Sequence, residues 1–594
     1  MPVYNAPLED ILFILNDVVG IADLSKLKGY EDVTPDLVQS ILEECAKLCT
    51  NEIAPLNLSG DQEGCHFENG IVRTPKGFKE AYKLFIDAGW QALSGDKNYG
   101  GQGMPKSMDF TVSEMLCGAN LSFSMYPMLT HGAYEALINH GTDELKKTYL
   151  PKLIEGSWSG TMCLTEPHCG TDLKLLRTKA VPQNDGSYKI TGTKIFISAG
   201  EHDLTDNIIH LVIARTPDAP EGIKGISLFI VPKFMPKADG TLGPRNGVYC
   251  GSIEHKMGIK ASSTCVMNFD EAQGYLVGNL NEGMKCMFTM MNAARLGVGM
   301  QGLGLAEVAY QNAVIYAKER LQGRSLSGVK CPEKPADPLI VHPDIRKMLL
   351  TIKSFVEGAR ALAYDVAYHI DISMLHDDPK TREEADDYVS LMTPVIKAFL
   401  TDYGFESTNL ALQVFGGHGY IVEHGMEQFV RDARISQIYE GANGIQALDL
   451  VGRKLSQHSG RLMRQFFPVI DQFVRDHKEN PGMADFTQPL ADGLSKLQQA
   501  TMYVAQKGMV DKEEAGAAAS DYCRLFGYVA LAHMWAKMAK VSLEKMNGEN
   551  PDFYRNKLST ARFYMSRMMP NCGALLTSIQ AGKKSIMELS EAAF

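Results

Sequence analysis

The feature that most constrains the fold is a change in the spacing of apolar residues along the chain. Residues 34–156 carry helical spacing, but from Ser157 to about Gly278 the period shortens to two and turn residues become frequent. Helical spacing returns at Met284 and continues to the end. This order predicts a multidomain α+β protein, with a middle antiparallel β-barrel or sandwich between two helical regions.

A chain of 594 residues is too long for one compact core, so several domains are expected. The segment after the β region predicts a four-helix bundle followed by a further helical domain. The predicted parts are an N-terminal extension (1–33), an N-terminal helical domain (34–156), a middle β domain (157–280), a helical bundle domain (281–457) and an additional C-terminal helical domain (458–594).

Local signals predict individual elements. The dipeptide Thr34-Pro35 predicts a helix start, with the threonine as N-cap. The tripeptide Asn184-Asp185-Gly186 between two β-type runs predicts a hairpin. Pro127 predicts a break in the helical sequence from Met108 to Ile154.

Composition and charge limit the classes of function. A net charge of −11 argues mildly against a nucleic-acid partner. The first twenty residues lack a cationic region and a small-residue cleavage site, and no run of about 18 apolar residues predicts a membrane span. The twelve cysteines are scattered, which favours free thiols in a reducing compartment over a zinc site. We therefore expect a cytoplasmic protein without a transmembrane segment or a metal.

One carboxylate, Glu440, has a setting suited to base chemistry. It follows Ile438 and Tyr439 and precedes a loop with two glycines, Gly441 and Gly444. Partial desolvation between apolar residues raises the pKa of a carboxylate and makes it a stronger base. The structural alternative is a helix C-terminus at which the glutamate is simply solvated.

Three other segments have the composition of ligand-binding loops. Residues 161–172, TMCLTEPHCGTD, combine turn chemistry with two hydroxyls, and residues 191–200 place an aromatic beside a hydroxyl in a strand. Residues 413–420, QVFGGHGY, put three glycines after a helix, which permits close approach of a ligand to the backbone. Each has an ordinary alternative: a strand end, a core aromatic and a helix cap. The glycine-rich residues 98–103 are interpreted as a turn, because no strand precedes them and no lysine follows.

Together and in this order, these segments resemble the acyl-CoA dehydrogenase family of flavoproteins. The likeness spans roughly residues 35–455 and is carried by NYGGQGMP (98–105), CLTEPHCGTDL (163–173), GTKIFISAG (192–200), QVFGGHGY (413–420) and RDARISQIYEGANGIQ (431–446). The N-terminal extension and the C-terminal helical addition are similar to a longer bacterial subgroup.

The resemblance implies FAD-dependent dehydrogenation of an acyl-CoA thioester to a trans-2-enoyl-CoA. It gives Glu440 the role of the base that removes the α-proton, while flavin N5 takes the β-hydride. It also implies electron transfer to an electron-transfer flavoprotein, and a homodimer, or a tetramer, with FAD at the subunit interface.

The resemblance further assigns binding positions to this sequence. FAD contacts are implied for Met162, Leu164, Thr165, Gly170, Thr171, Phe196, Ile197, Ser198, Arg320, Gln413, Gly416, Gly417, Ala442 and Gly444. Substrate contacts are implied for Thr171, Asn292, Arg295 and Gly441. An insertion in residues 320–338 departs from the family pattern, so that Arg324 shares or takes the role of Arg320. Asn292 replaces the usual aspartate.

Two other functions fit the same sequence. An acyl-CoA oxidase of the same fold would let oxygen reach the reduced flavin. A flavin-bearing DNA-binding relative would use a basic surface, and residues 536–583 contain many lysines and arginines. These alternate with apolar residues at helical spacing, which favours a solvated helix face.

Overall fold

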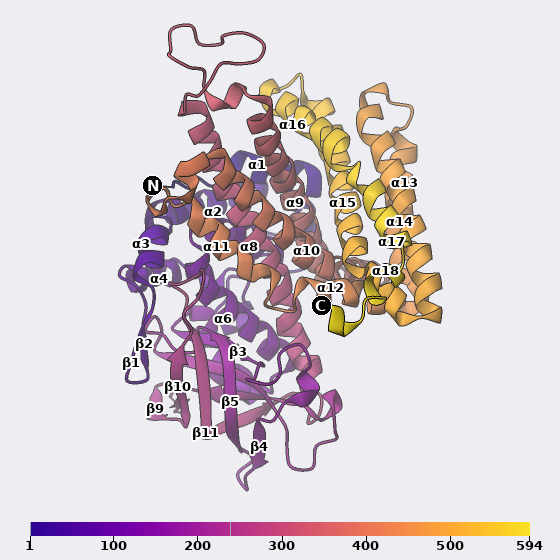
Figure 1. The fold of residues 1–594 in the computed structure, drawn as a ribbon. Coiled ribbons are helices and arrows are strands. Elements are labelled where there is room, and N and C mark those ends of the chain that lie inside the picture. The colour runs from indigo at the N-terminus through magenta and orange to yellow at the C-terminus, as the bar shows by residue number, and fades with distance from the viewer. Residues whose placement is uncertain (1, 238) are drawn as a thin grey trace. The chain divides into compact units, whose positions relative to one another are not determined.

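The computed structural model describes residues 2–237 and 239–594. The chain divides into two compact units, one of Lys47–Gly297 and one of Val298–Phe594 together with the described residues up to Ala46 (Figure 1). Both boundaries between the units lie within helices. The first lies near the end of α2 (Pro35–Leu48), and the second lies inside α8 (Gly283–Glu319). The predicted α+β organisation is confirmed. No helix among the described residues is long and apolar enough to cross a bilayer.

The unit of Lys47–Gly297 begins with helices. These are α3 (Leu56–Glu63), α4 (Phe78–Asp87), α5 (Lys106–Ala119), α6 (Leu121–His140) and α7 (Asp143–Glu155), with a small hairpin of β1 (His66–Glu68) and β2 (Ile71–Arg73). The predicted break at Pro127 is wrong, because Pro127 lies inside α6. The break falls at Asn120, whose side chain accepts the N–H of Phe123 at 3.1 Å as an N-cap. Burial of α6 on most of its surface outweighs the hydrogen bond that proline removes.

The β region forms a seven-stranded sheet. Its strands are β3 (Trp158–Cys163), β4 (Lys179–Pro182), β5 (Tyr188–Ser198), β6 (Asn207–Ala214), β7 (Ser227–Pro232), β10 (Val248–Ile253) and β11 (Thr264–Val277). The order is β3-β6-β7-β11-β5-β4, with β10 also on β11, while β8 (Phe234–Pro236) and β9 (Leu242–Arg245) form a separate hairpin. The pairs are antiparallel as predicted, except that β3 and β6 are parallel. The predicted hairpin joins β4 to β5, with Gly186 in the left-handed region at φ 83°.

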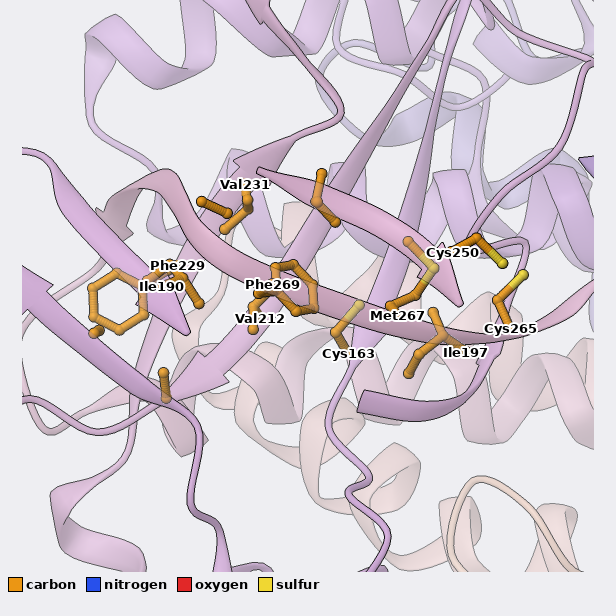
Figure 2. Packing of buried hydrophobic residues seen from close by; sticks show 14 of the residues in the cluster. Cys163, Ile190, Ile197, Val212, Phe229, Val231, Cys250, Cys265, Met267 and Phe269 are labelled. Carbon is orange, nitrogen blue, oxygen red and sulfur yellow. The ribbon is translucent and has the colours of Figure 1, made fainter. Parts of the chain in front are cut away.

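The sheet curls around a closed apolar core. The long strand β11 carries two bulges and pairs with β5 at one end and with β7 at the other. The edge strand β4 meets the end of β6 through Ala180 N–H and the carbonyl of Arg215, at 2.8 Å. Figure 2 shows side chains of these strands packed together. The core includes Cys163, Ile190, Ile197, Val212, Phe229, Val231, Cys250, Cys265, Met267 and Phe269.

The second unit is helical. Its helices include α1 (Leu8–Phe13), α2 (Pro35–Leu48), α9 (Pro343–Leu375), α10 (Pro379–Val414), α11 (Met426–Arg434), α12 (Asn443–Asp449), α13 (Arg461–His477), α14 (Ala484–Val510), α15 (Lys512–Lys545), α16 (Pro551–Phe563), α17 (Asn571–Gln580) and α18 (Lys584–Met587). The predicted cap of α2 is confirmed, since the hydroxyl of Thr34 accepts the N–H of Leu37 at 3.3 Å.

Helix α15 lies at the centre of the C-terminal addition. It packs against α9, α10 and α12 of the preceding bundle and against α14, α16 and α17 of the addition itself. Its Trp535 is fully buried and donates to the carbonyl of Ser354 in α9 at 2.9 Å. The N-terminal segment joins the same unit, because the carboxylate of Asp10 forms ion pairs with Arg360 of α9 and Lys557 of α16.

Candidate functional site

A buried ion pair fixes the loop that follows β3. The ammonium of Lys194, in β5, donates to the carbonyl of Leu164 at 3.0 Å and to Glu166 Oε1 at 2.9 Å. Glu166 also accepts the N–H groups of Arg177 at 2.8 Å and Thr178 at 3.0 Å. Both charged side chains are almost fully buried, at 0% and 2% exposure. Burial alone would raise the pKa of Glu166, but Lys194 and these donors hold it below its usual value.

This ion pair brings several predicted cofactor residues together. Met162 lies half-buried in β3, and Leu164 and Thr165 follow it in the loop. The carbonyl of Thr165 accepts the N–H of Ile195 at 2.9 Å, which ties the loop to the end of β5. Gly170 and Thr171 lie exposed further along.

The end of β5 presents an aromatic ring outward. Phe196 is 60% exposed, whereas Ile197 is 2% exposed and packs in the core (Figure 2). Strand alternation therefore leaves the side chains of Phe196 and the half-buried Ser198 available to a ligand. Ile197 can offer a ligand only its backbone. Phe196 and Ala199 both have left-handed backbones, at φ 59° and 54°, a conformation that costs non-glycine residues about 1–2 kcal/mol.

Among the residues that the structure describes, Glu166, His168 and Cys169 are close enough to share a metal ion. The carboxylate oxygens of Glu166 are already used by Lys194 and by backbone donors. Burial raises the pKa of the Cys169 thiol, which disfavours the thiolate that a metal requires. The arrangement is that of a structural ion pair.

The helical unit carries Glu440 in a sharp turn. A 3₁₀ turn at Ile435–Gln437 ends before it, and α12 begins after it at Asn443. Glu440 is half-buried, and both Glu440 and Gly441 have left-handed backbones, at φ 55° and 82°. Glu440 therefore lies in a strained reversal between two helical elements, which differs from a solvated helix end.

Two amide side chains anchor this turn. Asn443 Nδ2 donates to the carbonyl of Ala398 at 3.2 Å and to Asp402 Oδ1 at 2.7 Å, and its Oδ1 accepts from Lys397 at 2.8 Å. Gln446 Nε2 donates to the carbonyls of Glu440 at 3.3 Å and Gly441 at 3.2 Å. Sequence reasoning did not single out either amide. Their positions close to Gly441 and Gly444 were the available signal.

The predicted glycine positions leave open space. A Cβ at Gly416, Gly417 or Gly444 would meet nothing within 4 Å. Gln413 is exposed in the last turn of α10, and Ala442 is half-buried just before α12. A ligand can approach the backbone closely at these glycines, next to exposed polar groups.

His418 lies in the same segment and contacts two other side chains. The hydroxyl of Tyr316 lies 2.9 Å from His418 Nδ1. The rings of His418 and His424 stack, with 4.7 Å between their centres. These contacts give His418 a structural role.

The two arginines of the insertion after α8, Arg320 and Arg324, have different surroundings. The guanidinium of Arg324 donates to the carbonyls of Cys331 at 2.9 Å and Lys334 at 2.6 Å, and pairs with Asp337 at 3.3 Å. Backbone N–H donors, first that of Ser325, lower the pKa of Asp337 to about 2. Arg324 thus organises its own loop. Arg320 lies exposed just beyond α8, which makes it the better candidate for a ligand contact.

The predicted substrate residues on α8 contact one another. Arg295 donates to Asn292 Oδ1 at 3.3 Å, and its guanidinium lies 5.9 Å from the ring of Phe288. Arg295 is 6% exposed, whereas Asn292 is exposed. Their contact with CoA stays a prediction.

Four family profiles match the chain in succession. They are "Acyl-CoA dehydrogenase, N-terminal domain" at residues 36–157, "Acyl-CoA dehydrogenase, middle domain" at 161–272, "Acyl-CoA dehydrogenase, C-terminal domain" at 281–455 and "Acetyl-CoA dehydrogenase C-terminal like" at 466–590. The last match covers most of the helical addition.

Individual relatives agree with these matches. The chain is 41% identical to a 3-methylmercaptopropionyl-CoA dehydrogenase of Ruegeria pomeroyi, over 96% of this chain and 97% of that protein. A Bacillus anthracis acyl-CoA dehydrogenase solved with FAD has a TM-score of 0.75 at 19% identity, covering 96% and 91%, which supports the fold. A structure described as the electron transferring flavoprotein of Acidaminococcus fermentans has a TM-score of 0.59 at 28% identity, covering 72% and 99%. The chain belongs to the acyl-CoA dehydrogenase family of oxidoreductases, in the longer subgroup with an additional C-terminal helical domain.

Proposed function

We propose that this enzyme oxidises an acyl-CoA thioester to a trans-2-enoyl-CoA, with Glu440 as the base and an electron-transfer flavoprotein as the acceptor. The observation that carries the proposal is the turn at Glu440, where a strained backbone and two anchoring amides hold the backbone that carries this carboxylate. Family membership makes FAD the cofactor, as the resemblance implied.

The residues present suit a flavin. The exposed ring of Phe196 beside Ser198 offers an apolar face and a hydroxyl for a planar heterocycle. The open backbone at Gly416 and Gly417 accepts a phosphate-bearing chain without a steric clash. We assign ring contacts to Met162, Leu164, Thr165, Gly170, Thr171, Phe196, Ile197 and Ser198, and further cofactor contacts to Arg320, Gln413, Gly416, Gly417, Ala442 and Gly444. Bound FAD supplies the hydride acceptor.

The chain's own contribution is proton abstraction. An α-proton of a thioester is weakly acidic until the carbonyl is polarised, so a base needs donors to the thioester oxygen. We assign the base to the carboxylate of Glu440 and a donor role to its backbone N–H, as the family resemblance implies. We assign Gly441 to the thioester, and Asn292 and Arg295 to the CoA moiety.

Substitution of Glu440 by glutamine tests the base. The variant keeps the shape of the side chain but cannot take a proton, so anaerobic bleaching of the flavin by acyl-CoA should slow by about 10³-fold or more. FAD content and acyl-CoA binding should persist. Glu479→Gln, at a side chain that is 89% exposed, is the control and should bleach at the normal rate. Undiminished bleaching in Glu440→Gln would move the base elsewhere.

The acceptor separates the dehydrogenase from an oxidase of the same fold. Reoxidation of the reduced enzyme by an electron-transfer flavoprotein, with little hydrogen peroxide in air, is the expected result. Stoichiometric peroxide would favour the oxidase. Light scattering during gel filtration should give the mass of a homodimer or tetramer, and a stable monomer would contradict that part of the proposal.

The basic C-terminal residues do not favour a DNA-binding function. Most of them pair with acidic side chains, which neutralises the surface that a phosphate backbone needs. These pairs are Lys537–Asp365, Lys545–Asp17, Arg555–Asp552, Lys557–Asp10, Arg562–Asp485 and Lys583–Asp511.

A further inference from the structure

We propose that the C-terminal helical domain positions the catalytic base through one ion pair, between Arg524 of α15 and Asp402 of α10. The proposal rests on the function proposed for Glu440. It gives the additional domain a role in the reaction, with Asp402 and Arg524 as positioning residues that do not touch the substrate.

Asp402 holds the base turn on both sides of Glu440. Its Oδ1 accepts from Asn443 Nδ2 at 2.7 Å and from Gln437 Nε2 at 2.7 Å. One residue precedes the base by three positions and the other follows it by three. A single carboxylate oxygen therefore ties together the two ends of the strained reversal.

The other oxygen of Asp402 faces the C-terminal domain. Arg524 NH2 lies 3.6 Å from Asp402 Oδ2, and its guanidinium lies 5.8 Å from the ring of Tyr403, the next residue of α10. An arginine that contacts both a carboxylate and an aromatic face has little freedom to turn away. It fixes the carboxylate plane, and thus the direction in which Oδ1 meets the two amides.

Further contacts hold α15 in place at this point. The hydroxyls of Tyr403 and Tyr528 share a hydrogen bond, and Asn571 of α17 donates to the Tyr528 hydroxyl at 3.1 Å. Helix α12, which begins at Asn443, packs against α15. These contacts hold α15 where Arg524 meets Asp402, so that the ion pair has a fixed position next to the base turn.

A second arginine of the C-terminal domain offers a matched control. Arg461 of α13 binds Asp387 of α10 at 2.6 Å and Glu383 at 2.7 Å. Asp387 lies about 22 Å from Asp402 along α10. The Arg461 pairs attach the domain to the same helix without reaching the base turn, so their loss removes attachment and leaves positioning intact.

The test compares Arg524→Met with Arg461→Met in the full-length holoenzyme. At saturating acyl-CoA, Arg524→Met should slow flavin reduction by about tenfold, because small displacements of a reacting group are costly. FAD content and KM should stay near their normal values. Arg461→Met should reduce at the normal rate, and Arg524→Lys should recover part of the loss.

Asp402→Asn gives an independent reading. Asparagine keeps an oxygen for the two amides but presents an NH2 group to Arg524, so it should slow reduction about as much as Arg524→Met. The double variant should be no slower than either single variant if both act through one contact. Additive losses, or an equal loss in Arg461→Met, would overturn the proposal.

Comparison with the Glu440→Gln variant distinguishes failure of this proposal from failure of the base assignment. If Glu440→Gln abolishes bleaching while Arg524→Met reduces at the full rate, positioning by the C-terminal domain is wrong and the base stands. If Glu440→Gln bleaches normally, the base assignment fails and this proposal fails with it.

Discussion

The loop after β3 and the turn at Glu440 are fixed by different chemistry. A buried charge pair, Lys194 with Glu166, holds the first, and charged partners are expensive to leave unpaired. The second is held by hydrogen bonds of the amides Asn443 and Gln446, to Asp402 and to backbone carbonyls, and by a left-handed backbone. We therefore expect the two regions to respond differently to substitution. A change in the loop after β3 should lower the free energy of unfolding, and a change in the Glu440 turn should lower the rate of flavin reduction.

The largest effect is expected at Lys194. Replacement by methionine leaves the Glu166 carboxylate buried without its cation, which should cost about 3–5 kcal/mol of unfolding free energy. Urea denaturation of the purified variant measures the loss. Lys189→Met on the same strand is the control and should change little, because that side chain is partly exposed. Removing both charges, with Lys194→Met and Glu166→Met, should restore most of the stability; a double variant as unstable as the single one would contradict this explanation.

The β region should also be acid-sensitive through two buried histidines. Burial, with a contribution from Lys233, lowers the pKa of His202 and of His210 to about 3. The unfolded chain takes up these protons near pH 6.5, so stability is full above that pH and falls as the pH drops towards 3. At pH 4.5 the loss should approach about 2–3 kcal/mol for each histidine.

Substitution at His210 isolates its part of that loss. His210→Gln should make the unfolding free energy fall less steeply between pH 6.5 and 4.5, whatever its effect at neutral pH. His66→Gln, at a side chain that is 65% exposed, should leave the slope unchanged. Equal slopes in all three proteins would show that His210 does not contribute.

Loss of Asn443 should affect rate more than folding. Asn443→Leu removes the hydrogen bonds to Ala398, Asp402 and Lys397, at a cost of about 1–3 kcal/mol. Flavin reduction should slow by about 10–100-fold, because the base turn loses its main anchor. Stopped-flow reduction and FAD content measure the two effects. A variant that reduces normally would show that the turn is held by its backbone alone.

The smallest effects concern glycine in the same turn. Gly441→Ala places a Cβ at φ 82° and should cost about 1–2 kcal/mol. Gly444→Ala lies in the first turn of α12, in open space, and should stabilise by about 0.5–1 kcal/mol. Denaturation curves of the protein freed of cofactor would compare them. Equal effects would mean that the left-handed backbone is not maintained in solution.

The sequence predicted the order of helices and strands because periodicity is a local property. It failed at Pro127, where tertiary packing keeps α6 continuous, and at the parallel pairing of β3 with β6, which depends on partners distant in sequence. The residues beside Glu440 left a solvated helix end open, and the role of base came from the family resemblance. Lys194–Glu166 and Arg524–Asp402 join distant positions, so no local pattern marked them. The choice between Arg320 and Arg324 likewise required the contacts of the inserted loop.

The ion pair of Asp10 with Lys557 has a consequence for synthesis of the chain. Its two residues are 547 positions apart, so at about 5–20 residues per second the ribosome needs about 30–110 s to supply the partner. During that time Lys47–Gly297 can be completed as a unit, but Ile11, Phe13 and Ile14 wait without the helices that bury them. The N-terminal segment is therefore an apolar region of the nascent polypeptide that is open to chaperones until the segment around Lys557 has been synthesised.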